Sequence, residues 1–302
     1  MSGVFYSNFG FEIKKELGSC SLHQYFTLKS NIMNITYFRT LVVAILAGFA
    51  LSMSAQSDYP GNYAKAPRFK ALLCYSETAE PAHVEFGLQA VDFFKDLTVG
   101  NGFILDVNID YRGMDYEKLS QYDVVIAVNT APGSKAEREA FEKYMENGGG
   151  WIGFHASAYN DQGTKWPWFN EFLGCGTFLC NNWPPQPALL DVNLTNHPVT
   201  KNLPVSFVAP KNEWYMWNEA PDTRDNVDVL LSVSPKNFPL GIKDVVSFGE
   251  YPVVWTNRNY RMIYMNFGHG DREFSDATQN LLIINALRWI VSKSPKGNPF
   301  TR

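Results

Sequence analysis

The sequence predicts an α/β protein built on a doubly wound, parallel β-sheet. Short apolar runs alternate with amphipathic stretches from residue 69 to residue 154, a pattern typical of strands separated by helices. The run Asp123–Val128 is almost entirely aliphatic, as expected of a parallel strand covered on both faces. Three glycines at 148–150 precede an apolar strand that ends at His155. A histidine is therefore expected at the carboxyl end of a strand, where open α/β sheets bind ligands.

The first strands and the first helix are predicted from apolar spacing. Phe69–Tyr75 is expected to be a buried strand. A helix is expected over about 83–97, because apolar residues recur there at helical spacing. Phe103–Val107 and Asp123–Val128 are the expected second and third strands. The helix residues expected to face the sheet are Val84, Leu88, Val91 and Phe94.

A capping box at Ser134–Glu137 predicts the start of the next helix. Gly148 is expected to end that helix in the left-handed conformation, and Trp151–Phe154 is the expected fourth strand. The apolar face of the helix comprises Ala140, Phe141, Tyr144 and Met145.

The second half of the chain is less regular. Residues 156–188 are aromatic and rich in Gly, Pro and Asn, which is typical of a functional loop or lid. Strand-like runs follow at 189–194, 205–208, 213–217, 227–233, 253–256 and 261–267. Asp276 is expected to cap a final helix. Its buried face is predicted to hold Leu281, Ile284, Leu287, Ile290 and Val291. No boundary or repeat interrupts residues 68–293, which predicts a single domain.

The N-terminal region has the layout of a secretory signal peptide. Arg39 precedes an apolar run that small residues close near Ala55. The run is about eleven residues long, whereas a bilayer span needs about 20. Met33 lies where such a peptide should start. We interpret 1–32 as an over-extended N-terminus, 33–55 as the signal peptide, 56–67 as a linker and 294–302 as a tail. These segments predict a secreted or periplasmic protein with no integral membrane segment after cleavage.

Composition excludes one class of partner and leaves others open. The net charge is −4 and no Lys/Arg cluster is present, which argues against nucleic-acid binding. Aromatic residues make up 15% of the chain, which indicates a large core or, less often, platforms that stack on sugars. Three cysteines follow the signal, too few for a disulfide framework. The sequence does not decide whether Cys175 and Cys180 form a disulfide. It does not decide the oligomeric state either.

Three histidines follow predicted strands and are expected to meet at one edge of the sheet. His83 ends the loop after the first strand, His155 ends the fourth, and His269 follows the run 261–267. The carboxyl ends of parallel strands lie at the same edge, so convergence is more probable than three separate structural roles. His197 precedes a proline and is interpreted as a turn residue.

Carboxylates accompany these histidines. Glu213 lies between aromatic residues in a strand-like run, where a half-buried glutamate can act as an acid or a base. The alternative, to which we give equal weight, is that Glu213 lies on an edge strand and faces water. Glu77 and Glu80, in the loop after the first strand, could face the same edge. Asp271 could orient an imidazole or cap a turn.

No motif calls for an organic cofactor. The chain has no Gly-x-Gly-x-x-Gly after a strand and no Walker A loop, so the sequence requires no dinucleotide or nucleotide. No His-x-x-x-His pair is present. A divalent metal is possible on ligand chemistry alone, although the spacing does not predict one. Its candidate ligands would be His83, His155, Glu213 and His269.

Ordered motifs give the chain a family resemblance. They are Gly148–Ala156, Asn196–Thr200, Glu213–Tyr215, Pro252–Trp255 and Gly268-His269, with Thr78 and His83 in the first loop. With these motifs the chain resembles the ThuA-like (trehalose-utilisation) family over about 68–293. The resemblance implies a flavodoxin-like, class I glutamine amidotransferase-like fold, which is a three-layer sandwich with a mostly parallel sheet.

The resemblance also carries functional expectations. It implies that the protein is no glutaminase, since that activity needs a cysteine where His155 stands. ThuA-like proteins are associated with disaccharide catabolism through 3-keto sugars. Family members usually carry a histidine shortly after Leu-Gly-Gly. Here Leu173-Gly174-Cys175-Gly176 is followed by Phe178–Asn182, without a histidine, which makes a metal site less expected.

The leading hypothesis is a secreted or periplasmic enzyme that processes a carbohydrate, with a 3-keto glycoside or disaccharide as the expected substrate. His155 is the expected base, with His269 or Glu213 as the acid, because such chemistry needs two titratable groups of different pKa. The expected substrate-binding residues are Glu77, His83, Trp183, Trp214, Tyr215 and Asp271, the three aromatic ones by stacking on the sugar. The alternatives are a non-catalytic sugar-binding protein on the same fold and a metal-dependent hydrolase.

Overall fold

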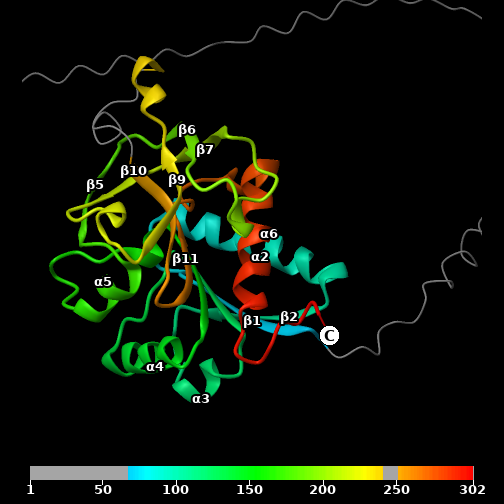
Figure 1. Ribbon diagram of the computed structural model, residues 1–302. Coiled ribbons are helices and arrows are strands. Elements are labelled where there is room, and N and C mark those ends of the chain that lie inside the picture. The colour runs from blue at the N-terminus through cyan, green and yellow to red at the C-terminus, as the bar shows by residue number, and fades with distance from the viewer. Residues whose placement is uncertain (1–66, 241–250, 302) are drawn as a thin grey trace, which may run out of the picture. The chain divides into compact units, whose positions relative to one another are not determined.

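The structure is a computed structural model that describes residues 67–240 and 251–301 (Figure 1). The expected over-extended N-terminus, the signal peptide and nearly all of the linker lie outside the described residues. Within the described ranges, no helix combines the length and the apolar character needed to cross a membrane.

A nine-stranded sheet forms the centre of the molecule, in the order β2-β1-β3-β4-β11-β10-β9-β6-β7. Five neighbouring strands, from β2 to β11, pair in parallel, and the remaining four extend the sheet in antiparallel pairing. Its strands are β1 Phe69–Tyr75, β2 Phe103–Ile109, β3 Val124–Val128, β4 Gly150–Phe154, β6 Gln186–Val192, β7 Ser206–Asn212, β9 Val227–Val233, β10 Tyr251–Asn257 and β11 Arg261–Met265.

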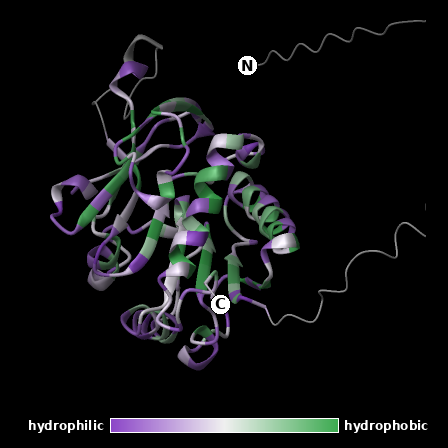
Figure 2. Ribbon diagram, turned by 45° about the vertical axis from the view of Figure 1, so that its right-hand side comes forward, coloured by the Kyte–Doolittle hydropathy of each residue, from purple (hydrophilic) through white to green (hydrophobic). Residues whose placement is uncertain are grey.

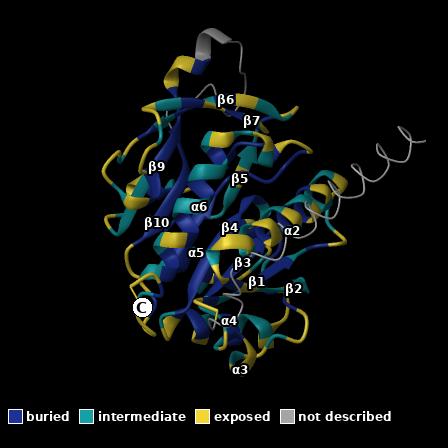
Figure 3. Cartoon of the chain, turned by 90° about the vertical axis from the view of Figure 1, so that its right-hand side faces the viewer, coloured by how far each residue is buried: buried dark blue, intermediate teal, exposed yellow. Residues whose placement is uncertain are grey.

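The order 2-1-3-4 of the first four strands is the flavodoxin-like arrangement, so the expected fold class is confirmed. All five residues of β3 and of β4 are buried, because helices cover both faces of this part of the sheet. In Figure 3 the central strands are almost wholly buried, whereas exposed residues lie on the outer faces of the helices. Figure 2 shows the same distribution as hydropathy, with apolar residues concentrated in the strands.

Two layers of helices enclose the sheet (Figure 1). On one face, α2 (Pro81–Asn101) and α6 (Ala277–Ser292) share a core cluster with strand residues such as Ile152. On the other face, α3 (Tyr116–Leu119), α4 (Lys135–Glu146) and α5 (Pro167–Leu173) pack over a second cluster. Each layer buries a separate apolar surface of the same sheet.

The helix boundaries follow from local chemistry. The Ser134 side chain accepts from the Glu137 N–H, and the Glu137 carboxylate accepts from the Ser134 N–H, which confirms the capping box of α4. Gly148, at φ 80°, lies just beyond the end of this helix, in the left-handed conformation expected there. Asp276 caps α6 by accepting from the Gln279 N–H.

The predicted helix faces were partly wrong. On α2, Leu88 is 53% exposed, whereas Phe86 and Ala90 face the core together with the expected Phe94. On α6, Leu282 and Ile283 are fully buried, whereas the expected Leu281 and Ile284 are only half-buried. Both helices carry apolar residues on more than one face. The spacing of apolar residues alone therefore did not identify the face that packs against the sheet.

The segment 156–188 contains more structure than the predicted loop or lid. It forms α5, and its aromatic residues pack into the second core cluster with Phe141 of α4. It then forms β5 (Phe178–Asn181), which pairs with β8 (Tyr215–Trp217) in a separate two-stranded sheet. The cysteines of the described residues are free thiols, so Cys175 and Cys180 do not form a disulfide.

The α6 packing predicts a difference between two neighbouring leucines. Leu282→Ala should lower the free energy of unfolding by about 2–5 kcal/mol, because the lost side chain leaves a cavity in the core. Leu281→Ala, the matched control at a half-buried position, should lower it by about 1 kcal/mol or less. Chemical denaturation of both variants measures the difference. Equal losses would contradict the observed face of α6.

Candidate active site at the carboxyl edge of the sheet

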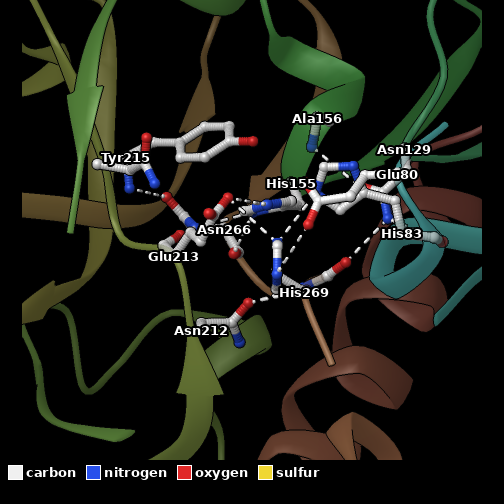
Figure 4. Close-up of polar contacts among 12 residues, drawn as sticks. Glu80, His83, Asn129, His155, Ala156, Asn212, Glu213, Tyr215, Asn266 and His269 are labelled. Atoms are coloured by element: carbon white, nitrogen blue, oxygen red, sulfur yellow. Dashed lines mark hydrogen bonds and ion pairs between the residues drawn. The ribbon is translucent and has the colours of Figure 1, made fainter. Parts of the chain in front are cut away.

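The three expected histidines and Glu213 lie together at the carboxyl ends of the parallel strands (Figure 4). His83 is in the first turn of α2, just after β1. His155 directly follows β4, and His269 follows β11 after three residues. Glu213 comes from the opposite side, between β7 and β8. We call these four residues the histidine–glutamate cluster.

Short distances join the members of this cluster. The His269 Nδ1 atom lies 3.1 Å from Glu213 Oε2 and 3.1 Å from His83 Nε2. The His155 Nε2 atom lies 3.6 Å from the same Glu213 oxygen. One nitrogen or oxygen of each residue falls within 4.8 Å of those of all the others. Four groups that can donate an electron pair therefore face one small volume.

His155 is the most enclosed member of the cluster. Its side chain is 0% exposed, and its backbone is at φ 49°, a left-handed conformation that is uncommon for a residue with a side chain. The ring packs against Tyr215, with 4.2 Å between centroids. On the other ring edge, Nδ1 lies 3.1 Å from the backbone oxygen of Asn266. The Nε2 atom is buried and has no hydrogen-bond partner.

Burial and mutual contact set the charges of the cluster. Burial, together with the neighbouring imidazoles, lowers the pKa of His83 to about 3. Burial also lowers the pKa of His155 below its ordinary value. Burial alone would raise the pKa of Glu213, but interactions with the neighbouring His155 and His269 imidazoles outweigh it and lower that pKa to about 2. At neutral pH, His83 and His155 are therefore neutral and Glu213 is ionised.

Buried asparagines hold the loops that carry the cluster. Asn129, which directly follows β3, donates its side-chain N–H groups to the carbonyls of His83 and Gly268. Its side-chain oxygen accepts from the Ala156 N–H at 3.0 Å. One amide thus joins the backbones beside all three histidines.

Asn266 and Asn212 hold the other side of the cluster. Asn266 accepts from the Tyr215 N–H at 2.7 Å and donates to the Glu213 carbonyl at 2.6 Å, which fixes the backbone on both sides of Trp214, directly after Glu213. Asn212 accepts from the N–H groups of Gly268 and His269. These amides were not among the residues predicted from the sequence. Their signal was a polar residue at or directly after a strand end.

A cavity of about 590 Å³ opens beside the cluster. Glu80, His83 and Glu213 contribute ionisable groups to its wall, and Tyr215 contributes an aromatic ring. Glu80 is half-exposed, and its Oε1 atom lies 3.7 Å from His269 Nε2. His155 and His269 are not part of the wall. The role of base expected for His155 does not fit this position, because a fully buried ring cannot touch a substrate in the cavity.

Two aromatic residues expected to stack on a sugar have different surroundings. Trp214 is 0% exposed, and its Nε1–H donates to the Gln186 carbonyl, so its predicted stacking role was wrong. Trp183 is 65% exposed, and its ring centroid lies 6.5 Å from that of His269. Trp183 is therefore exposed beside the histidine–glutamate cluster, where a ligand could reach it.

Two carboxylates expected at the site are outside it. Glu77 is exposed and accepts a hydrogen bond from the Tyr75 hydroxyl at 3.1 Å, and it does not line the cavity. Asp271 pairs with Lys211 at 3.3 Å and contacts no imidazole of the cluster. Neither residue therefore contributes to the cavity wall, and each has a partner on the surface. His197 accepts from the Val199 N–H, as expected of a turn residue.

A larger cavity, of about 1150 Å³, lies near the amino ends of β4 and β11. Its wall includes Gly148, Arg261 and Trp289. The Arg261 guanidinium donates to the carbonyls of Gly148, Asp123 and Ile290, so it serves the fold there. The cavity holds no histidine–carboxylate cluster, and we therefore place the candidate site at the opposite edge.

Fold and site define a glutamine amidotransferase-like sandwich with a histidine in place of a cysteine after β4. The chain belongs to the ThuA family, described as trehalose utilisation, whose model matches residues 71–290. A ThuA-like protein of known structure from Bacteroides uniformis is 64% identical, with a TM-score of 0.76 over 81% of this chain and 100% of that one.

A second ThuA-like structure, from Parabacteroides merdae, is 22% identical, with a TM-score of 0.55 over 76% of this chain and 92% of that one. At this identity the likeness shows the fold alone. A search of curated proteins found no match.

Glu273 contacts Asn212, which holds the backbone beside His269, and its burial predicts a pH-dependent stability. It is buried and accepts from Asn212 and Gln279, but burial dominates and raises its pKa to about 7. In an unfolded chain a glutamate titrates near pH 4.3. The folded protein therefore holds this proton more tightly. Its contribution to stability is complete below about pH 4 and is lost as the pH rises through about 7.

Between pH 5 and pH 8, the free energy of unfolding of the wild-type protein should accordingly fall by on the order of 3 kcal/mol because of this group. Glu273→Gln should remove that part of the pH dependence, whereas Glu85→Gln, at an exposed position on α2, should keep it. Denaturant unfolding at several pH values measures how the free energy of unfolding of each variant changes with pH. A Glu273→Gln variant with the wild-type slope would show that this carboxyl does not titrate in the range.

Proposed function

We propose that this protein is a secreted or periplasmic enzyme that processes a carbohydrate, with a 3-keto glycoside or disaccharide as substrate. The observation that carries the proposal is the meeting of Glu80, His83 and Glu213 in the wall of one 590 Å³ cavity. Membership of a family described as trehalose utilisation supports the substrate class. The signal-like segment before Ala55 supports the location.

The cavity wall has the mixed character that sugars need. Tyr159, Phe178 and Tyr215 provide aromatic surface for the apolar faces of a sugar ring. Asn181 and Thr130 provide hydrogen-bonding groups for its hydroxyls. Small-molecule sites typically combine aromatic surface with a few polar groups in this way.

We assign proton transfer to Glu80, because it is the carboxylate that both lines the cavity and is open to it. A ketone at the third carbon of a sugar acidifies the C–H bond at the second carbon. Glu80 takes that proton, and the C–H electron pair forms an enolate. The enolate then expels the glycosidic oxygen, which receives the proton from Glu80. Each bond broken is balanced, and no oxidant or reductant is needed.

The surroundings of His155 argue against acyl transfer. A glutaminase needs a thiol at this position, and Cys74 and Cys175 are buried elsewhere with raised pKa values because of that burial. In a nucleophile elbow, the N–H of the next residue stabilises an oxyanion. Here the Ala156 N–H is engaged by Asn129. The site therefore supplies neither the nucleophile nor the free donor.

Glu80→Gln should lower turnover of 3-keto disaccharides by about 10²–10⁴-fold, the usual contribution of a positioned acid–base group. Glu77→Gln is the matched control, because Glu77 lies in the same loop but outside the cavity. Mass spectrometry of a panel of native and 3-keto disaccharides, incubated with each protein, measures the products.

Three outcomes of this experiment are decisive. Products from 3-keto sugars that are lost only in Glu80→Gln support the proposal. Equal turnover by both variants would remove Glu80 from the mechanism. Tight binding of unmodified disaccharides without any product would favour the non-catalytic sugar-binding alternative and overturn the enzymatic one.

A further inference from the structure

We propose that the histidine–glutamate cluster binds one divalent transition-metal ion at the edge of the cavity. The ligand atoms would be His83 Nε2, His155 Nε2, His269 Nδ1 and Glu213 Oε2. This inference goes beyond the proposed function and does not depend on it, because it rests on the geometry of the four side chains alone.

The spacing of the ligand atoms fits a metal centre. Ligands held at about 2.0–2.1 Å from a tetrahedral ion lie about 3.4 Å from one another. The separations in the structure are 3.1 Å from His269 Nδ1 to Glu213 Oε2, 3.1 Å from His269 Nδ1 to His83 Nε2, and 3.6 Å from His155 Nε2 to Glu213 Oε2. Small adjustments of side-chain angle would bring all four atoms to equal distances from one ion.

The unpartnered nitrogen of His155 is a second, independent observation. The Nε2 atom is fully buried and has no hydrogen-bond partner. Its nearest acidic group, Glu213 Oε2, is 3.6 Å away, which is too long for a hydrogen bond in either tautomer of the ring. A buried polar atom without a partner is rare and destabilising. A cation between this nitrogen and the carboxylate would satisfy both.

His269 presents the same problem in another form. Its Nδ1 atom is 3.1 Å from both Glu213 Oε2 and His83 Nε2, and one hydrogen cannot serve both contacts well. With the proton on Nε2, toward Glu80, the Nδ1 lone pair faces the Glu213 carboxylate directly. Two electron-rich atoms at this distance repel one another, and either a hydrogen on Nδ1 or a positive ion bound by both atoms relieves that repulsion.

The outer nitrogen of His155 has a partner typical of a metal ligand. His155 Nδ1 lies 3.1 Å from the Asn266 carbonyl and 3.2 Å from the Asn266 side-chain nitrogen, and a hydrogen on Nδ1, donated to that carbonyl, would leave Nε2 free to bind. His269 Nε2 faces the Glu80 carboxylate at 3.7 Å, beyond hydrogen-bond distance, so Glu80 would have to move slightly to form the same kind of pair. Such partners orient metal-binding histidines and fix which ring nitrogen carries the hydrogen.

The donor set selects the class of ion. Three imidazole nitrogens and one carboxylate oxygen suit Zn²⁺ and the neighbouring transition metals. Mg²⁺ and Ca²⁺ prefer sites built from oxygen, so they should bind poorly here. Because His83 and Glu213 line the cavity, a fifth ligand could approach the ion from that side. A hydroxyl or carbonyl oxygen of the substrate has the chemistry to be that ligand.

The test uses the full chain without a histidine tag, stripped of metal with a chelator. Titration with Zn²⁺ in a calorimeter should show one ion per chain, and Mg²⁺ should show no binding. Co²⁺ should give the visible absorption band of a four- or five-coordinate nitrogen and oxygen site. Glu213→Gln and His155→Gln should each weaken Zn²⁺ binding by at least ~100-fold.

His197→Gln is the matched control, because His197 lies outside the cluster and should leave metal binding unchanged. Circular dichroism of the metal-free proteins checks that each variant folds. If His155→Gln fails to fold, Glu213→Gln, at the cavity wall, decides the question. Absence of Zn²⁺ binding, or equal binding in wild type and Glu213→Gln, would overturn the proposal. Because no substrate is used, that result would leave the carbohydrate proposal standing.

Discussion

The hydrogen bonds of Asn129 are the contacts on which the rest of the site depends. The three histidines lie on separate segments, after β1, β4 and β11. Asn129 bonds to the backbone beside each of them. Removal of a buried partner leaves its neighbours unsatisfied, which costs about 1–3 kcal/mol for each group. The positions of the imidazoles therefore depend on an amide that contacts no ligand.

The topology of the sheet explains why this linkage is needed. Parallel pairing of β1, β3, β4 and β11 brings four carboxyl ends to one edge, and chain segments leave that edge in different directions. The antiparallel half of the sheet then contributes Glu213 from the end of β7. Asn212 and Asn266 join this half to the parallel half. The site is thus a junction between two halves of one sheet, held by buried amides.

The sequence predicted the parts of the structure that follow from local periodicity. Two strands, Phe69–Tyr75 and Val227–Val233, have the predicted bounds, because apolar runs flanked by polar residues are unambiguous there. The meeting of the histidines followed from the rule that parallel strands end at the same edge. The amide framework was missed, since an asparagine after a strand also fits an ordinary turn. Trp214 was misplaced for a related reason, because burial of a single aromatic residue depends on distant packing.

Gly268 faces His155 so closely that a Cβ at position 268 would collide with the Cβ of His155. Any residue larger than glycine would displace the imidazole, so these two loops must change together in evolution. Glycine is therefore required at position 268 for as long as position 155 carries a side chain in this conformation.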